Sequence, residues 1–470
     1  MLLAVPIALG SSMLADDLDE AITALMAKRN IPGLSLAIVE DGAIVKAKGY
    51  GVVEQGSTTP VTTDTLFQAG SVSKSLAALG ALHLVEARKI SLDTDVNLTL
   101  KTWHIPDNRF TKYRNVTLRR LLSHSAGLTV HGFPGYAADA PLPTLVQVLN
   151  GEKPANTRAI RVDLVPGTQW RYSGGGYTVL QQLIIDITGM TFPDFMRAQV
   201  LGPLGMQAST YEQPLPADRA ALAASGHYPG RPPKPVPGRW HVYPEMAAAG
   251  LWTTPSDLAR FVIALQDTFA GRSAQVISPA MAAQMLTRQQ DNDGLGVFLV
   301  GAAETMRFEH DGRDEGFDTE MTAYAKKGQG AVIMINTNEN TLAVAQIMKT
   351  ISEIYGWQDY PRGKPGRPTG DKQAELTGRL KVVLEQLRSG KLRDDYFGAE
   401  FVAVITPHLA EIEQNLTTFG ALESIALVER GDAGNRLTYR YRVVFKNKTV
   451  IARCNYDKDG KIAGLNLQPE

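Results

Sequence analysis

The chain has 470 residues, a formal net charge of zero, and Cys454 as its single cysteine. This length predicts two or three domains, and a balanced charge without a long basic run argues against nucleic acid as a partner. An internal disulfide is excluded, no Cys/His cluster has zinc spacing, and no cofactor is expected. Cys454 lies in a strand-like run and is interpreted as a small buried hydrophobe.

Residues 1–15 resemble the remnant of a secretory signal. An apolar run over 2–9 precedes small residues at 11–15, although no basic residue comes before it. The run is too short to cross a membrane, and no other segment predicts an integral span. We therefore expect a periplasmic or secreted protein.

Residues 16–357 alternate between helical and strand patterns, which predicts an antiparallel sheet packed against helices. Helices are expected over 16–29, after Ser71, within 116–129, and over 176–188 and 342–355. Strands are expected over 34–40, 43–53, 295–300, 305–309, 321–325 and 331–336, with a hairpin turn at Asp41-Gly42. The Pro- and Gly-rich segment 207–245 is typical of a functional loop or lid.

Residues 358–372 are rich in Pro, Gly and charge, and they predict a linker to a small α+β domain over 373–470. Helices are expected there over 376–387 and 397–419, followed by strands over 425–429, 437–445, 449–456 and 462–467. The element order and the run 459–465 resemble the nuclear-transport-factor-2-like class. Such a domain could narrow substrate access, mediate oligomerisation or bind its own ligand.

Ser71 and Lys74 form the most informative pattern, at the start of a long apolar helix. Residues three apart share a helix face, so the amine would lie where it can take the serine proton or hold the alkoxide. Backbone N–H groups at a helix start also favour negative charge. The same four residues would alternatively form a helix N-cap followed by a solvated lysine.

Acyl transfer by such a pair also needs a proton relay, an oxyanion hole and a strand edge for the substrate. Tyr172 is the candidate relay, because a tyrosine near an ammonium can titrate well below its free value. The alternative is a core tyrosine with a satisfied hydroxyl. His310, Asp311 and Gly312 precede a predicted strand and are candidates for the substrate edge, although His310 could also be structural.

With these motifs in order, residues 17–357 resemble the class C β-lactamase family in its broad sense, which includes penicillin-binding carboxypeptidases, D-aminopeptidases and family VIII esterases. Four non-catalytic stretches also match the family pattern: 121–128, 166–173, 201–206 and 249–258. The resemblance implies an α+β fold, an antiparallel sheet flanked by helices with an all-helical subdomain.

The resemblance further implies a metal-free serine hydrolase that acts through an acyl-enzyme on small esters, amides or D-amino-acid-containing peptides. The implied catalytic residues are Ser71, Lys74 and Tyr172. The implied oxyanion hole consists of the N–H groups of Ser71 and Arg313. The implied substrate-binding residues are Gly174, His310, Asp311 and Gly312.

Two departures from the family pattern shift the expected activity away from antibiotic hydrolysis. Gly174 stands where the second motif has asparagine, and His310 stands where β-lactamases have lysine. The alternatives are a true β-lactamase or penicillin-binding protein, and a non-catalytic binding or scaffold protein. His124 is expected to order its loop rather than act as a base. Arg313 and Asp314 would either bind a charged end of the substrate or pair with each other at the surface. The sequence allows a homo-oligomer but does not decide the oligomeric state.

Overall fold

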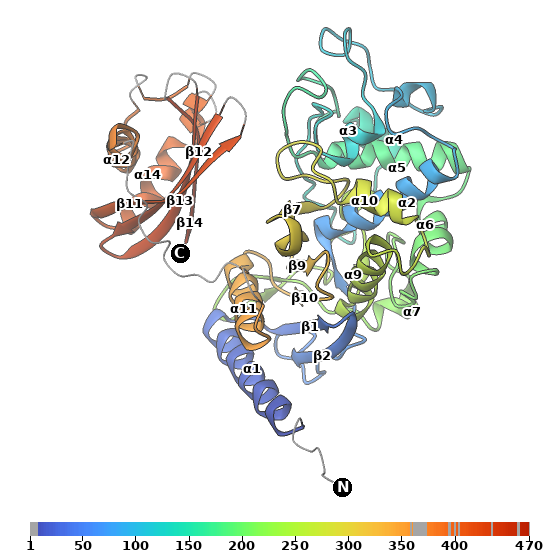
Figure 1. Cartoon of the computed structure of the whole chain (residues 1–470), viewed down its shortest axis with the longest axis horizontal. Helices are drawn as coiled ribbons and strands as arrows, with labels where there is room; N and C mark the ends of the chain where they lie inside the picture. The colour runs from blue at the N-terminus through green and yellow to red at the C-terminus, as the bar shows by residue number, and fades with distance from the viewer. Residues whose placement is uncertain are drawn as a thin grey trace. The chain divides into compact units, whose positions relative to one another are not determined.

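The structure is a computed structural model that describes residues 8–357, 360, 374–392, 396–398, 401–402, 405–433, 436–457 and 461–469. The chain divides into two compact units, 1–359 and 360–470, each with its own hydrophobic core (Figure 1). The first seven residues of the predicted signal segment and, apart from Tyr360, the predicted linker lie outside the described residues. The remainder of the signal segment continues the predicted first helix, so that α1 spans Ala8–Arg29.

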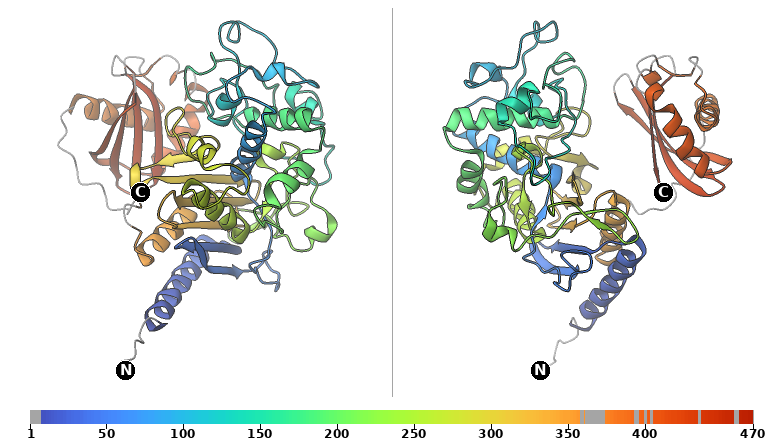
Figure 2. Two further views of the ribbon diagram at one scale, coloured as in Figure 1. Left: turned by 45° about the vertical axis from the view of Figure 1, so that its right-hand side comes forward. Right: turned by 180° about the vertical axis from the view of Figure 1, so that it is seen from behind.

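The first unit is built on a six-stranded antiparallel sheet in the order β2-β1-β10-β9-β8-β7. Helix α9 packs on one face, against Ala37 and Val39, and α1 and α11 pack together on the other (Figures 1 and 2). The central strands are apolar because both faces are covered. The bounds are β1 Gly33–Glu40, β2 Ala43–Gly51, β7 Phe298–Val300, β8 Arg307–Asp314, β9 Phe317–Tyr324, β10 Gly330–Ile335, α9 Pro255–Phe269 and α11 Thr341–Ile354.

The predicted hairpin between β1 and β2 forms. Asp41 and Gly42 have φ values of 50° and 72°, which are the positive angles that a two-residue hairpin turn requires.

A helical region continues from the sheet and shares its main hydrophobic core. The buried helices α2 and α5 lie against each other there, and α8 contacts both. The helices and turns are η1 Gly70–Val72, α2 Ser73–Glu86, η2 Val96–Leu98, α3 Leu118–Leu122, α4 Leu145–Asn150, α5 Gly174–Thr188, α6 Phe192–Met196, η3 Arg197–Leu201, α7 Ala217–Ala220, α8 Met246–Ala249, α10 Pro279–Met285 and η4 Ala303–Thr305. Short strands pair as β3 Phe67–Gln68 with β6 Trp252–Thr253, and β4 His227–Tyr228 with β5 Lys234–Pro235.

The predicted fold class, an antiparallel sheet flanked by helices with a helical subdomain, is confirmed. Of the boundaries that differ from the sequence-based expectation, two bear on the site. Helix α5 begins at Gly174, because Ser173 caps it by accepting the Gly176 N–H at 3.0 Å. Strand β8 extends five residues beyond the predicted end at Glu309, so the motif at 310–312 lies inside a strand. The segment 207–245 is mixed: His227 and Tyr243 are almost fully buried, whereas most of the Pro- and Gly-rich part over 229–238 is exposed.

The second unit consists of helices packed against an antiparallel sheet in the order β11-β12-β13-β14. The predicted helix over 397–419 is wrong at its start, because Phe397 pairs with Ile462 in an isolated β-bridge, whereas residues 401, 402 and 405 are helical and α14 begins at Leu409. Cys454 is buried in this core, and burial raises the pKa of its thiol to about 12. The bounds are α12 Ala374–Arg388, η5 Thr406–His408, α14 Leu409–Thr418, β11 Leu422–Ala433, β12 Arg436–Phe445, β13 Lys448–Tyr456 and β14 Ile462–Pro469.

Within the described parts of both units, no helix has the length and apolar character to cross a membrane.

Candidate active site

Ser71 lies in the 3₁₀ turn η1, and Lys74 lies in the first turn of α2 directly after it. The Lys74 ammonium nitrogen donates to Ser71 Oγ at 2.9 Å and to the carbonyl oxygen of Ala248 at 2.7 Å. Lys74 is 2% exposed, yet both it and Ser71 border a cavity. The structure therefore brings the predicted hydroxyl and amine together, and Ala248 holds the amine from a distant segment.

Burial determines the charge of Lys74. Desolvation lowers the pKa of this amine to about 7, and the carboxyl groups of Asp314 and Asp311 oppose the shift. A substantial fraction of the amine is therefore unprotonated at neutral pH. An unprotonated amine at hydrogen-bonding distance can accept the proton of Ser71.

Ser73, between the two reacting groups in sequence, links the Ser71 turn to the segment that follows α8. Its hydroxyl donates to the carbonyl oxygen of Gly70 at 2.6 Å and accepts from the Leu251 N–H at 3.0 Å. Ser73 is fully buried. The turn that carries Ser71 and the segment that carries Ala248 are thus joined by one hydroxyl group.

Tyr172 lies on the loop before α5 and borders the same cavity. Its hydroxyl lies close enough to Ser71 for that hydroxyl to offset part of its desolvation, and Lys74 Nζ lies 5.0 Å from its ring centroid. Tyr172 is partly exposed at the cavity, yet desolvation still raises the pKa of its hydroxyl above the usual range. The expectation of a lowered tyrosine pKa is therefore wrong, because burial outweighs the nearby amine. Tyr172 is a neutral phenol that can both accept and donate a hydrogen bond.

His124 packs against Tyr172, with ring centroids 4.2 Å apart. Its Nδ1 accepts the Ser173 N–H at 3.1 Å, which fixes the residue after Tyr172. Burial lowers the pKa of His124 well below its usual value, so the ring is neutral. These contacts fit the expected role of ordering the loop.

Strand β8 packs its backbone directly against the Ser71 turn. A Cβ atom on Gly312 would lie 2.0 Å from the carbonyl oxygen of Ala69 and 3.0 Å from the Ser71 nitrogen. A Cβ atom on Gly70, which has a φ of 51°, would lie 2.4 Å from the Arg313 nitrogen. The two predicted oxyanion-hole nitrogens, those of Ser71 and Arg313, therefore belong to segments in close contact.

Gly312→Ala is expected to damage both the fold and the site, because no real Cβ tolerates the 2.0 Å contact with Ala69. Urea unfolding should show a loss of about 2–3 kcal/mol, and labelling of Ser71 by an activated probe should slow strongly. Gly176→Ala is the matched control, since its nearest neighbours would lie at 3.7 Å. That variant should retain labelling and gain up to about 1 kcal/mol of stability. Equal behaviour of the two variants would contradict the packing argument.

Arg313 and Asp314 do not pair with each other. The Arg313 guanidinium binds Asp318 at 2.7 Å, and Asp318 is 1% exposed. Asp314 is buried, and neither of its carboxyl oxygens has a partner with full hydrogen-bond geometry, although the Gly70 N–H and the Tyr243 hydroxyl lie close enough to offset part of the desolvation. Burial raises the pKa of Asp314 well above its usual value.

Asp314→Asn is expected to shift the pH dependence of Ser71 labelling to lower pH. In its ionised form Asp314 stabilises protonated Lys74, so removing that charge makes the amine easier to deprotonate. Because burial raises the pKa of Asp314, the shift should appear at pH values where this carboxyl group is ionised. Rates of probe labelling between pH 5 and 9 would measure the shift. Asp311→Asn should shift the profile less, because Asp311 is exposed and is the smaller of the two influences on Lys74. A larger shift for Asp311→Asn would contradict this assignment.

The cavity in front of Ser71 has a volume of about 460 Å³. Asp311 and Arg313 border it with the three predicted catalytic residues, whereas Gly174, His310 and Gly312 are not among its lining residues. His310 is buried, with its ring 5.0 Å from that of Phe298. Sequence reasoning missed several lining residues: His131, Gly132, Phe133, Trp170, Tyr243, Ala248, Ala249, Phe298 and Glu315. Of these, only Trp170 and Ala249 fall in stretches that matched the family pattern.

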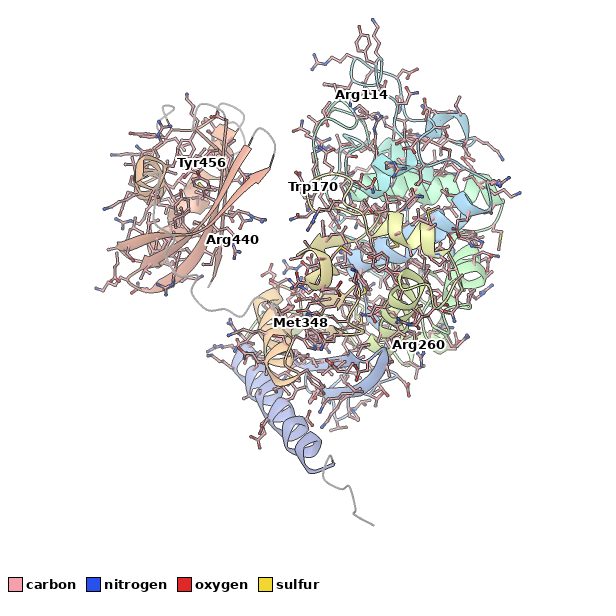
Figure 3. All side chains as sticks on the ribbon, in the orientation of Figure 1. Arg114, Trp170, Arg260, Met348, Arg440 and Tyr456 are labelled. Atoms are coloured by element: carbon pink, nitrogen blue, oxygen red, sulfur yellow. The ribbon has the colours of Figure 1, made fainter. Side chains whose placement is uncertain are left out.

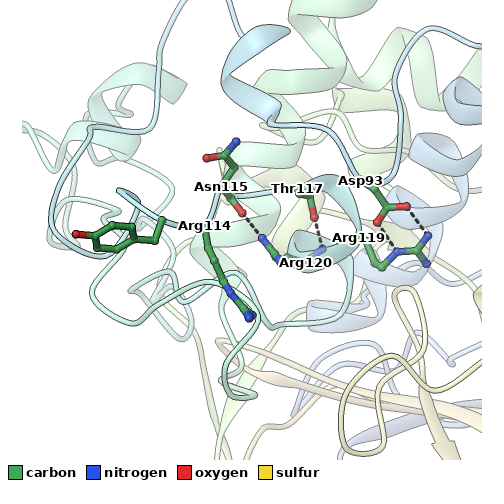
Figure 4. A pocket seen from close by; sticks show the side chains of 7 residues that line it. Asp93, Arg114, Asn115, Thr117, Arg119 and Arg120 are labelled. Carbon is green, nitrogen blue, oxygen red and sulfur yellow. Dashed lines mark hydrogen bonds and ion pairs between the residues drawn. The ribbon is translucent and has the colours of Figure 1, made fainter.

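A second cavity, of about 410 Å³, lies near α3 and is lined mainly by charged and polar residues (Figure 4). Arg119 forms a double hydrogen bond with Asp93 there, and Arg120 donates to the Asn115 carbonyl. It contains none of the Ser71 group. Across the described residues, no cluster of His, Cys, Asp or Glu is arranged to hold a metal ion.

Residues 18–350 match the family model described as Beta-lactamase, and the chain therefore belongs to the Beta-lactamase family. It is similar to Penicillin-binding protein 4 of Amycolatopsis lactamdurans, with 31% identity over 281 residues that cover 58% of this chain and 68% of that protein. It is also similar to the unguisins hydrolase ungD' of Aspergillus campestris, with 28% identity over 347 residues that cover 69% of this chain and 62% of that protein.

Two solved structures share the fold. The octameric penicillin-binding protein homologue from Pyrococcus abyssi aligns with a TM-score of 0.59 at 20% identity, covering 97% of this chain and 98% of that chain. The penicillin-binding protein from Bacillus halodurans aligns with a TM-score of 0.55 at 20% identity, covering 70% of this chain and 98% of that chain. The family predicted from the motifs is confirmed, and the relatives support a serine hydrolase of this superfamily. The likeness of the second unit to the nuclear-transport-factor-2-like class stays a prediction.

Proposed function

We propose that the protein hydrolyses small esters, amides or D-amino-acid-containing peptides through an acyl-enzyme on Ser71. The observation that carries the proposal is the buried Lys74 amine, with a pKa of about 7, at 2.9 Å from the Ser71 hydroxyl oxygen. This amine can be unprotonated at neutral pH, which a solvated lysine cannot be.

In acylation, Ser71 Oγ bonds to the substrate carbonyl carbon while its proton passes to Lys74 Nζ. The N–H groups of Ser71 and Arg313 would stabilise the oxyanion. When the bond to the leaving group breaks, the proton passes from Lys74 to the leaving oxygen or nitrogen, with the Tyr172 hydroxyl as the relay. Water then attacks the acyl carbon, one of its protons returns to Ser71 Oγ, and the acid is released.

A fluorophosphonate probe tests the acyl-enzyme directly. The expected result is one adduct on Ser71 in the intact-protein mass. Rates with nitrocefin and with p-nitrophenyl esters then separate the alternatives, because a true β-lactamase would turn over nitrocefin faster and a scaffold protein would turn over neither. Absence of an adduct, under conditions that label a control hydrolase, would overturn the proposal.

The non-catalytic alternative rests on Gly174, which provides no amide to support the substrate carbonyl or Lys74. A protein that binds a ligand without hydrolysing it would retain the cavity, and Ser71 would not be labelled by the probe. Export and self-association are further proposals, which fractionation of the source cells and light scattering of the purified chain would test. We also propose that the second unit limits access or carries a partner surface.

A further inference from the structure

Trp170 presents an aromatic surface at the cavity that contains Ser71. Its side chain is 36% exposed, which is unusual for so large an apolar group, and it lies two residues before Tyr172 (Figure 3). The indole N–H donates to the carboxyl group of Asp293, which is 2% exposed. A buried partner therefore fixes an exposed ring, so a ligand that stacks on it need not immobilise it.

Phe298 is connected to Trp170 through Asp293. Asp293, which binds Trp170, pairs with Phe298 in an isolated β-bridge. The Phe298 ring is nearly parallel to that of Tyr172, with an angle of 24° and centroids 6.3 Å apart. The short segment from Asp293 to Phe298 thus contacts or carries two aromatic rings at the cavity, and one of them, Phe298, lies beside Tyr172.

Phe133 explains why residue 174 is glycine. A Cβ atom on Gly174 would lie 3.0 Å from a ring carbon of Phe133 and 3.0 Å from the carbonyl oxygen of His131. An asparagine at this position would require Phe133 to move. Because Phe133 also borders the cavity, an aromatic ring occupies the neighbourhood that an amide would otherwise need.

Most of the charged residues at the cavity come from a different segment. Asp311, Arg313 and Glu315 come from β8 and the turn after it, and Arg313 is already paired with Asp318. The three aromatic rings at 133, 170 and 298 come from other segments. The cavity therefore combines an aromatic group of residues with a polar strand edge.

We infer that Trp170, Phe133 and Phe298 form a binding site for an aromatic ring, so that the preferred substrates carry such a ring next to the scissile carbonyl. This inference rests on the proposed function and narrows its substrate class. Aromatic rings prefer stacked or edge-to-face contacts with one another, which rings from three segments can provide together.

Thioesters whose leaving thiolate is not conjugated to an aromatic ring test the inference. The ethyl thioesters of butyric and phenylacetic acids differ by a ring on the acyl side, and the ethyl and benzyl thioesters of acetic acid differ by a ring on the leaving side. We expect kcat/KM to be about tenfold higher for a ring on one of the two sides. Trp170→Leu should slow the aromatic substrates more than the aliphatic ones and so remove most of that preference. Tyr113→Leu is the matched control, because Tyr113 is 80% exposed and lies at the other cavity.

Equal rates for aromatic and aliphatic substrates, or an equal slowing of all substrates in Trp170→Leu, would overturn the inference. If the protein hydrolyses no thioester, calorimetric measurement of phenylacetamide and acetamide binding tests the aromatic site independently of hydrolysis. Binding of phenylacetamide that Trp170→Leu abolishes would support the aromatic site while the proposed hydrolysis fails. No such binding would overturn the inference as well.

Discussion

Replacing Ser71 with alanine is expected to reduce turnover by at least about 10⁴-fold and to eliminate covalent labelling. Its oxygen is the only serine hydroxyl that the Lys74 amine contacts among the described residues. Loss of a nucleophile in serine hydrolases has effects of this size or larger, because the remaining groups cannot form the acyl-enzyme. Steady-state rates on the best ester and the intact mass after probe treatment would measure both effects.

Ser75→Ala provides the matched control. Ser75 lies one helical turn further along α2, and its hydroxyl donates to the Gly296 carbonyl at 2.7 Å. Its loss should cost about 1 kcal/mol of stability and leave labelling in place. Labelling of Ser71→Ala at the wild-type rate would mean that the probe reacts elsewhere.

Lys74→Met is expected to stop turnover and to stabilise the protein at the same time. The lysine is 2% exposed, and its pKa is about 7 in the folded protein against 10.5 when free. Between these values the unfolded chain binds a proton that the folded chain does not, so the free energy of unfolding rises with pH. Below about pH 7 the folded protein bears the full cost of a buried ammonium. Methionine removes that cost, and a gain of about 1–3 kcal/mol is expected at pH 6.

The same lysine sets the expected pH profile of the wild-type protein. Activity should rise with pH and reach half its maximum near pH 7, because only the unprotonated amine can take the Ser71 proton. Urea unfolding of both proteins at pH 6 and pH 9, with kcat/KM over the same range, would test the two effects together. A stability difference that does not shrink at pH 9 would show that the buried charge is not its source.

The local part of the site could be predicted from sequence, and its surroundings could not. Ser71 and Lys74 are three residues apart, so helix geometry alone places them together. The hairpin at Asp41-Gly42 is similarly local. In contrast, the second acceptor of the Lys74 amine, the Ala248 carbonyl, is 174 residues away in sequence. Spacing within one helix or strand cannot predict a contact over that distance.

Burial explains the two electrostatic expectations that differ from the structure. Tyr172 lies near an amine as expected, but desolvation of its hydroxyl dominates its pKa. Arg313 and Asp314 were expected to read a charged substrate end or to pair with each other at the surface. The surface pair does not form, because β8 continues past the predicted strand end and buries Asp314, while both residues border the cavity. Burial of a side chain depends on the packing of whole elements, which periodicity within one segment does not specify.

The hydrogen bonds of the Ser73 hydroxyl restrict movement of the turn that carries Ser71. The Ser73 hydroxyl links Gly70 to Leu251, so the turn that carries Ser71 cannot shift without breaking a hydrogen bond of a fully buried side chain. The Leu251 amide should then be among the slowest to exchange its hydrogen for deuterium, and acylation should barely alter its rate. Substrate binding at Ser71 would then follow lock-and-key behaviour, with little reorganisation of the turn either before or after acylation.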